Sequence, residues 1–196
     1  MITIGLTGGI ATGKSTVGKL LRHKGIEVIS SDELAHRAIM PGESGYDKIV
    51  TEFGREIILP DGEIDRRLLG EIVFKNDNAR KRLEQIVHPI VINGIQQDLK
   101  RCSKRGIKLA VVEVPLLFEV GLTELFDYIW VVSSTLERQL QRLLERDRLT
   151  EAQARERITT QLSLKEKERR ADVVIENNNG LDSLEKQVSI LLKTLE

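Results

Sequence analysis

One short stretch near the N-terminus combines residue types that together can hold phosphate groups. In "GLTGGIATGKST", residues 5–16, Gly8, Gly13, Lys14 and Ser15 follow the spacing G-x-x-x-x-G-K-[ST]. Glycines let the backbone turn with its N–H groups pointing inward, the lysine reaches outer phosphates, and the serine hydroxyl offers a ligand to Mg²⁺. The stretch therefore predicts a loop that binds the phosphates of a nucleotide.

The segments on either side of this loop favour the same interpretation. An apolar run, "ITIGLT", precedes it and a helical pattern, "STVGKLLRHKG", follows it. A glycine-rich turn with an incidental lysine is the alternative, but the order strand, loop and helix is the context in which the motif binds nucleotides. The D-x-x-G and N-K-x-D motifs of signalling GTPases are absent from the sequence.

Five apolar, β-branched runs recur along the chain, at 2–7, 26–30, 109–114, 128–133 and 172–177. Helical patterns separate them, which predicts an α/β fold with a five-stranded parallel sheet covered by helices on both faces. The third run contains Glu113, which could face a buried cation, a water or a metal ion. The acidic pair that ends a strand in many motor ATPases is missing there.

About eighty residues separate the second and third runs, more than a crossover helix needs, so we expect an inserted helical lobe. Within it, "HP" at 88–89 predicts a break or kink, because proline disfavours helical backbone in the residue before it. His88 could contact a substrate or end a helix. A charged segment follows the fourth run, and it predicts two helices, "LERQLQRLLERDR" and "EAQARERITTQL".

Two groups of side chains could act on a bound nucleotide. Asp32 follows the second run, at the edge where open parallel sheets bind ligands, and could be a general base or a magnesium ligand. Ser30, Ser31 or Asp32 could equally cap the helix that follows. Arg138, Arg142 and Arg146 recur every four residues along one predicted helix. This helix could be solvated, or it could be a mobile lid whose arginines close over the triphosphate. The buried face expected on the same helix consists of Leu136, Leu140, Leu143 and Leu144.

Composition excludes several classes of function. The sequence contains 30 Lys and Arg and 30 Asp and Glu, so its formal charge of zero argues against nucleic acid as the main partner. No apolar stretch is long enough to span a membrane and no targeting segment is recognisable, so we expect a cytoplasmic location. Cys102 is the one cysteine, which excludes an internal disulfide and a multi-cysteine metal site.

In this order, the motifs resemble the dephospho-coenzyme A kinase family along nearly the whole chain. The resemblance rests on "GLTGGIATGKST", "SSDELAHRAIMPGESGYDKI", "DGEIDRRLLGEIVF", "RLEQIVHPIV", "VEVPLLFEVGL", "QLQRLLERDRLTEAQARERITTQ" and "ADVVIEN". It implies a P-loop kinase fold whose nucleotide-binding core comprises residues 1–31, 106–135 and 165–196. Residues 32–105 would form the lobe that binds the acceptor, and 136–164 the lid.

The resemblance also implies the reaction: transfer of the γ-phosphate of ATP, with Mg²⁺, to the 3′-hydroxyl of the ribose of dephospho-coenzyme A, with no obligate protein partner. Asp32, Lys14, Arg142 and Arg146 would be catalytic. Asp32, Arg66 and His88 would bind the acceptor, and Ser15 and Asp32 would organise the metal. ATP would be bound by Gly9, Ile10, Ala11, Thr12, Gly13, Lys14, Ser15, Thr16, Arg142 and Asn177.

Two alternatives stay open from the sequence. One is another small-metabolite P-loop kinase resembling nucleoside monophosphate kinases, although the loop lacks the G-x-P-G-x-G-K form common in adenylate kinases. The other is a regulatory module that binds ATP and transfers nothing. A product phosphorylated on the acceptor hydroxyl would distinguish the kinases from the module.

Overall fold

A computed structural model of the protein describes residues 1–147 and 149–195. It divides into two compact units, the first made of Met1–Ile29 with the chain from Cys102 onward, and the second of Ser30–Arg101. The lobe predicted at 32–105 has nearly the extent of the second unit. No helix in the described part of the chain is both long and apolar enough to cross a membrane.

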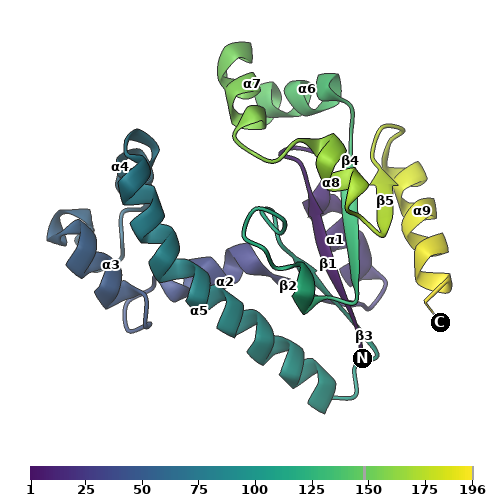
Figure 1. Ribbon diagram of the computed structural model, residues 1–196, viewed down its shortest axis with the longest axis horizontal. Coiled ribbons are helices and arrows are strands. Elements are labelled where there is room, and N and C mark those ends of the chain that lie inside the picture. The colour runs from purple at the N-terminus through teal and green to yellow at the C-terminus, as the bar shows by residue number, and fades with distance from the viewer. Residues whose placement is uncertain (148, 196) are drawn as a thin grey trace. The chain divides into compact units, whose positions relative to one another are not determined.

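The first unit is built on a sheet with the strand order β2-β3-β1-β4-β5 (Figure 1). β1 pairs in parallel with β3 and β4, and β4 pairs in parallel with β5. The strands are β1 Ile2–Gly8, β2 Glu27–Ser30, β3 Leu109–Glu113, β4 Tyr128–Ser133 and β5 Val173–Glu176. Each lies within one residue of the run predicted from sequence, and the α/β fold class is confirmed.

Helices cover this sheet because their apolar stripes meet its buried strands. The helices of the first unit are α1 Lys14–His23, α6 Leu136–Asp147, α7 Glu151–Thr159, α8 Leu164–Arg169 and α9 Leu181–Lys193, with a 3-10 turn at Thr123–Leu125. α1 and α9 pack with β1, β3, β4 and β5 in one apolar cluster that includes Trp130. α6 and α7 form the predicted helical pair; Arg148, quoted with the first of them, lies outside the described residues.

The second unit is helical and has its own core. It contains α2 Ser31–Ala38, α3 Tyr46–Phe53, α4 Arg66–Lys75 and most of α5 Asp77–Lys104, whose last three residues belong to the first unit, with a 3-10 turn at Arg55–Ile57. Ile49 and Phe53 of α3 pack with Leu69 of α4 and with Ala79 of α5. The main chain also forms one antiparallel bridge, between Ile58 and Ile64.

Of the break or kink predicted at His88–Pro89, the break is wrong, since α5 is one continuous helix through both residues. Figure 1 shows α5 as an unbroken helix. Proline in a helix removes one backbone hydrogen bond and crowds the carbonyl four residues earlier. Apolar contacts of α5 with the core of the second unit, through Leu83, Ile86 and Val87, lie just before the proline. These contacts, with 28 residues in the helix, offset the local loss.

The stripe predicted for α6 is wrong at one end. Leu136 is 42% exposed, whereas Gln139 is 4% exposed and donates from Nε2 to the carbonyl oxygen of Ser134, 3.0 Å away. Leu140 and Leu143 are buried with Ala154 of α7, as the periodicity predicts. The first turn of α6 therefore uses a hydrogen-bonded amide where a leucine was expected.

Gly5 gives a test of how tightly the sheet is packed. A Cβ on Gly5 would lie 2.5 Å from Leu117 Cδ1 and 2.7 Å from Phe126 Cδ2. We expect Gly5→Ala to lower the free energy of unfolding by about 1–3 kcal/mol, because overpacking forces neighbours from their rotamers. The measurement is the thermal midpoint followed by fluorescence of Trp130, the single tryptophan, which is 1% exposed in β4.

Gly70 is the matched control, because it lies inside α4 and a Cβ there would meet nothing within 4 Å. Gly70→Ala should leave the Trp130 transition unchanged or raise it, since alanine stabilises a helix interior relative to glycine by about 1 kcal/mol. Equal midpoints for Gly5→Ala and the wild type would show that β1 has room for a methyl group.

Candidate active site

The loop between β1 and α1 has an unusual backbone. Ala11 has φ 58° and Gly13 has φ 98°, both in the left-handed region; Ala11 is the one non-glycine residue with positive φ in the described part of the chain. Such a conformation costs a non-glycine residue about 1–3 kcal/mol and persists where the surroundings hold it. The hydroxyl of Thr12 donates to the carbonyl of Gly9, 2.9 Å away, and closes the turn.

Both glycines of the motif are also required by close approach. A Cβ on Gly8 would lie 2.6 Å from the carbonyl oxygen of Val132 in β4, and one on Gly13 would lie 2.0 Å from Nδ2 of Asn177. Neither contact is possible for a real side chain. The loop is therefore packed against the ends of β4 and β5 through its own main chain.

The start of α1 is suited to an anion. Among the described residues, the first turn of α1 contains no acidic side chain, and its N-cap, Gly13, supplies no side-chain hydrogen bond. Unpaired N–H groups and the helix dipole give such an end partial positive charge, which favours phosphate. Lys14 and Ser15 stand in this first turn, where the motif predicts them.

Lys14 has an anionic partner in the protein itself. Its Nζ lies 3.6 Å from Oε2 of Glu113, and a guanidinium nitrogen of Arg22 lies 3.1 Å from Oε1 of the same carboxylate. The Glu113 side chain is only 7% exposed, so two cations compensate one buried negative charge. Of the roles left open for Glu113, this geometry supports the buried cation.

Gly18 makes room for this carboxylate, since a Cβ there would lie 2.0 Å from Oε1 of Glu113. α1 can therefore approach the end of β3 closely. The result is that Lys14 and Arg22, on one helix, both reach the same side chain.

Arg142 of α6 contacts the loop directly. Its Nη1 donates to the carbonyl oxygens of Ala11, at 3.0 Å, and Thr12, at 3.1 Å. Its Nη2 donates to the carbonyl oxygen of Asn177, at 3.0 Å, and the Asn177 side chain donates from Nδ2 to Thr12 O, at 2.8 Å. The structure thus brings Arg142 and Asn177, both predicted to bind ATP, to the phosphate loop.

The electrostatics at Arg142 favour an added negative charge. Its pKa is lowered, first by burial of the guanidinium and second by the positive charge of Arg138. Both effects disfavour the charged form of the side chain. An anion bound nearby would stabilise the guanidinium.

Arg146 is arranged differently, although it lies one turn further along α6. Its side chain is 62% exposed and donates from Nε and Nη2 to the two carboxylate oxygens of Asp147, at 2.7 and 3.0 Å. The hydrogen bond to Asp147 raises the pKa of Arg146. Arg157 of α7 also pairs with Asp147, at 3.2 Å, so this carboxylate links the two helices.

Asp32 is not the helix cap. Ser30 is the N-cap of α2, and its hydroxyl accepts from the N–H of Glu33, at 3.2 Å. Asp32 follows within the first turn and is exposed. Of the residues considered for capping, Ser30 therefore fills that role and Asp32 is available for another.

The other residues predicted to bind the phosphate acceptor lie, like Asp32, in the second unit. Arg66 is the first residue of α4 and is exposed, behind the N-cap Asp65, whose carboxylate accepts from the N–H of Arg67 and of Leu68. His88 is half-buried within α5. Their roles toward the acceptor stay predictions.

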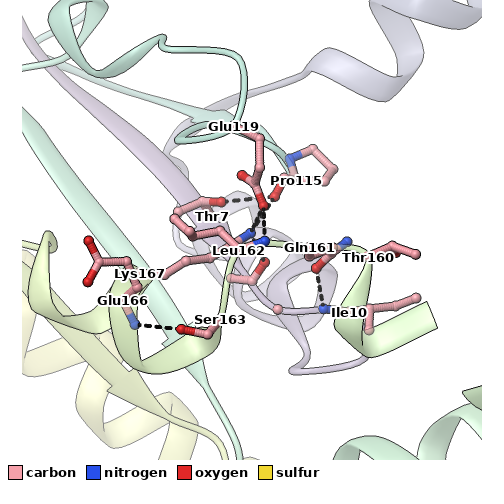
Figure 2. Close-up of polar contacts among 12 residues, drawn as sticks. Thr7, Ile10, Pro115, Glu119, Thr160, Gln161, Leu162, Ser163, Glu166 and Lys167 are labelled. Atoms are coloured by element: carbon pink, nitrogen blue, oxygen red, sulfur yellow. Dashed lines mark hydrogen bonds and ion pairs between the residues drawn. The ribbon is translucent and has the colours of Figure 1, made fainter. Parts of the chain in front are cut away.

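Sequence reasoning missed the side chains that approach the loop from the segment after α7. Oε1 of Gln161 accepts from the N–H of Ile10, at 3.0 Å (Figure 2). The ammonium of Lys167 lies 3.4 Å from the Gly8 carbonyl oxygen. This part of the sequence reads as a charged surface helix. A signal that could have found them is the stretch "QLSLKEK", where a helix cap stands between glutamine and lysine.

Comparisons with known proteins agree with this geometry. The family model for dephospho-CoA kinase matches residues 2–183. The dephospho-CoA kinase of Geobacter sulfurreducens is 44% identical over 96% of this chain and 95% of its own length. The dephospho-CoA kinases of Geobacillus kaustophilus and Arabidopsis thaliana are 46% and 44% identical over 98% of this chain, and over 96% and 83% of their own lengths.

Solved structures give the same result. A dephospho-CoA kinase from Campylobacter jejuni is similar with a TM-score of 0.75 and 30% identity, over 98% of this chain and 96% of that one. A shikimate kinase from Acinetobacter baumannii, with a TM-score of 0.57 and 20% identity over 100% and 93% of the two chains, shares the fold alone. With its phosphate loop and this match along almost its whole length, the chain belongs to the dephospho-CoA kinase family and is a kinase.

Proposed function

We propose that the protein transfers the γ-phosphate of ATP to the 3′-hydroxyl of the ribose of dephospho-CoA, with ADP and CoA as products, in the last step of CoA synthesis. The observation that carries this proposal is the phosphate loop, held between β1 and α1 with Lys14 and Arg142 at its two sides, in a chain of this family. The hydroxyl oxygen forms a bond to the γ-phosphorus as the bond to the bridging oxygen of ADP breaks.

In this proposal, the phosphate loop binds the donor. The residues from Gly9 to Thr16 surround the phosphates, and Lys14 exchanges its contact with Glu113 for one with the outer phosphates. Arg142 contributes from the middle of α6 and Asn177 from the residue that follows β5. Electrostatic stabilisation of this kind acts without a covalent intermediate, so direct in-line transfer is sufficient.

Ser15 fits a magnesium site of the type found in P-loop proteins. The described residues contain no group of three or more His, Cys, Asp or Glu side chains that could hold a metal. Mg²⁺ at such sites is bound mostly by water and substrate phosphates with one or two protein ligands, so the Ser15 hydroxyl at the start of α1 needs at most one further protein ligand. The ion would neutralise charge that develops on the phosphates.

We assign Asp32 as the general base, with Ser15 and Asp32 together organising the metal. Its carboxylate would accept the proton of the attacking hydroxyl as the oxygen–phosphorus bond forms. Its exposure and its freedom from the capping role support the assignment. Arg66 and His88 would bind the acceptor, and Arg146 would leave Asp147 to stabilise the transferring group.

A kinase of this type must keep water from the γ-phosphate, because water is a competing nucleophile. Movement of the lid, residues 136–164, around both substrates would exclude it. A coupled assay of ADP release over a panel of hydroxyl acceptors, with mass analysis of the product, tests the function. Release that needs dephospho-CoA supports the proposal, whereas acceptor-independent release would favour a regulatory ATP-binding module.

Asp32→Asn should lower kcat about 10²- to 10⁴-fold, the range that general-base catalysis contributes, while the KM for ATP stays within a few-fold. Steady-state kinetics measure both. Glu33→Gln is the matched control, an exposed acidic neighbour in the same turn, and should keep wild-type turnover. Near wild-type turnover of Asp32→Asn would remove Asp32 from the mechanism.

Chelation of divalent cations by EDTA should abolish phosphoryl transfer, and added Mg²⁺ should restore it, because the metal neutralises phosphate charge. Ser15→Ala should raise the Mg²⁺ concentration for half-maximal rate by about 10-fold or more through loss of its hydroxyl ligand. Ser103→Ala, an exposed serine in α5, is the control. A rate that EDTA leaves unchanged would exclude a metal-dependent mechanism.

Arg142→Met and Arg146→Met should separate binding from transfer. The first removes donors from the loop carbonyls, and we expect the KM for ATP to rise about 10-fold or more. The second leaves the loop intact, and we expect a fall in kcat of at least about 10-fold with little change in KM. Arg155→Met, an exposed residue of α7 paired with Glu151, is the control; the reverse pattern would exchange the two roles.

A further inference from the structure

Lys167 of α8 is a fully buried lysine, with 0% exposure. Lysine is almost never fully buried unless it is paired. Its Nζ lies 2.8 Å from Oε1 of Glu119 and 3.3 Å from the carbonyl oxygen of Pro115 (Figure 2). It also lies 3.4 Å from the carbonyl oxygen of Gly8. An ammonium has three N–H donors, so each of them has an acceptor.

Two of the three acceptors, the carbonyls of Gly8 and Pro115, lie at the edge of the sheet that carries the phosphate loop. Gly8 ends β1 and opens the motif, and Pro115 follows β3 by two residues. The hydroxyl of Thr7 also donates to the Pro115 carbonyl, at 3.2 Å. Lys167 therefore joins the ends of two neighbouring parallel strands.

The segment before Lys167 also forms hydrogen bonds with the phosphate loop and with Glu119. We call residues 161–167 the lid base, because they begin just after Thr160, the C-cap of α7. Within it, Gln161 accepts from the N–H of Ile10, and the N–H of Leu162 donates to Oε1 of Glu119, at 3.0 Å. Glu119 thus binds both the first part of the lid base and its buried lysine, as Figure 2 shows.

Stability alone does not explain a charge at this position. Burial of an ammonium and a carboxylate is opposed by the loss of their hydration, and an apolar pair of similar volume is often as stable. A methionine could fill the volume of Lys167, but it could not donate to the carbonyl of Gly8. The hydrogen bond to the carbonyl of Gly8 is therefore a contact with the phosphate loop that apolar packing could not replace.

We propose that Lys167 is a positioning residue for phosphoryl transfer: with Glu119 and Gln161 it fixes the first half of the phosphate loop to the lid base, so that the γ-phosphate is aligned for attack. The inference rests on the proposed function. Lys167 acts through the loop main chain, so its loss reduces turnover more than it weakens ATP binding. Small misalignments of reacting groups have large effects on rate.

The test uses the full-length protein and the double variant Lys167→Met with Glu119→Gln. The double variant contains neither charge, and the glutamine oxygen still accepts from Leu162, so it retains most of the stability. We expect kcat with dephospho-CoA to fall about 10- to 100-fold. The KM for ATP should stay within about threefold, and ADP release without acceptor should form a larger share of the total.

Two single variants show whether turnover depends on the lysine or on stability. Glu119→Gln keeps the donors to Gly8 and Pro115 but leaves a buried charge unpaired, so it should be less stable than the double variant and yet turn over faster. Lys165→Met, an exposed lysine on the same helix, is the control and should behave as the wild type. The Trp130 fluorescence transition measures stability in each case.

A double variant that folds and keeps kcat within about threefold of the wild type would show that Lys167 is structural only. If the double variant does not fold, Gln161→Met tests the proposal instead. Gln161 is half-buried, and its replacement removes only the acceptor of the Ile10 N–H. That variant should lower kcat about 3- to 10-fold at unchanged KM for ATP, and an unchanged kcat would overturn the proposal. A wild type that fails to phosphorylate dephospho-CoA would overturn the proposed function, and the positioning role with it.

Discussion

A loop that binds phosphate through its N–H groups must satisfy its carbonyl groups elsewhere, and much of the first unit is arranged around this constraint. The carbonyls of Ala11 and Thr12 are bound by Arg142, from α6. That of Gly8 is bound by Lys167, from α8, and that of Gly9 by the loop's own Thr12. Donors far apart in the sequence thus hold a backbone that would otherwise relax from its left-handed conformation.

The parallel sheet explains how such distant residues come together. Residues at and just after the carboxyl ends of parallel strands lie at the same edge of the sheet, where open α/β sheets bind ligands. Gly8 follows this rule at the end of β1, Glu113 at the end of β3 and Asn177 just beyond β5. Close packing there depends on small residues, since Gly8 and Gly13 leave no space for a side chain.

The sequence was sufficient to predict the fold, the phosphate loop and the strands, because their signals are local. The strands can be recognised from the composition of the apolar runs alone, and the phosphate loop can be recognised from the spacing of the residues around Lys14. Ser30 could not be separated from Asp32 as a cap, because both residue types cap helices. The burial of Lys167 could not be predicted, since burial depends on what packs over a side chain and the sequence "KEKERR" is typical of a solvated helix.

Tertiary contacts also explain the errors. Pro89 carries a strong local signal for interruption, but the core of the second unit holds the helix on which it lies. The amphipathic pattern predicts that Leu136 is buried and Gln139 is exposed. The reverse is observed, because the Gln139 amide donates to a backbone carbonyl and can therefore be buried. The roles of Arg66 and His88 toward the acceptor rest on the family resemblance, and that of Asp32 rests also on its position after the second strand.

The contact between Lys14 and Glu113 has a consequence for how nucleotide affinity responds to salt. In the proposed complex with ATP, a phosphate would replace Glu113 as the partner of Lys14, so that one ion pair would replace another and no unpaired cation would be neutralised. The electrostatic gain is then the difference between the attraction of Lys14 to the phosphate and its attraction to Glu113. Dissolved salt weakens both attractions. Nucleotide affinity should therefore decline less steeply with ionic strength than it would for a loop whose lysine stands alone in water.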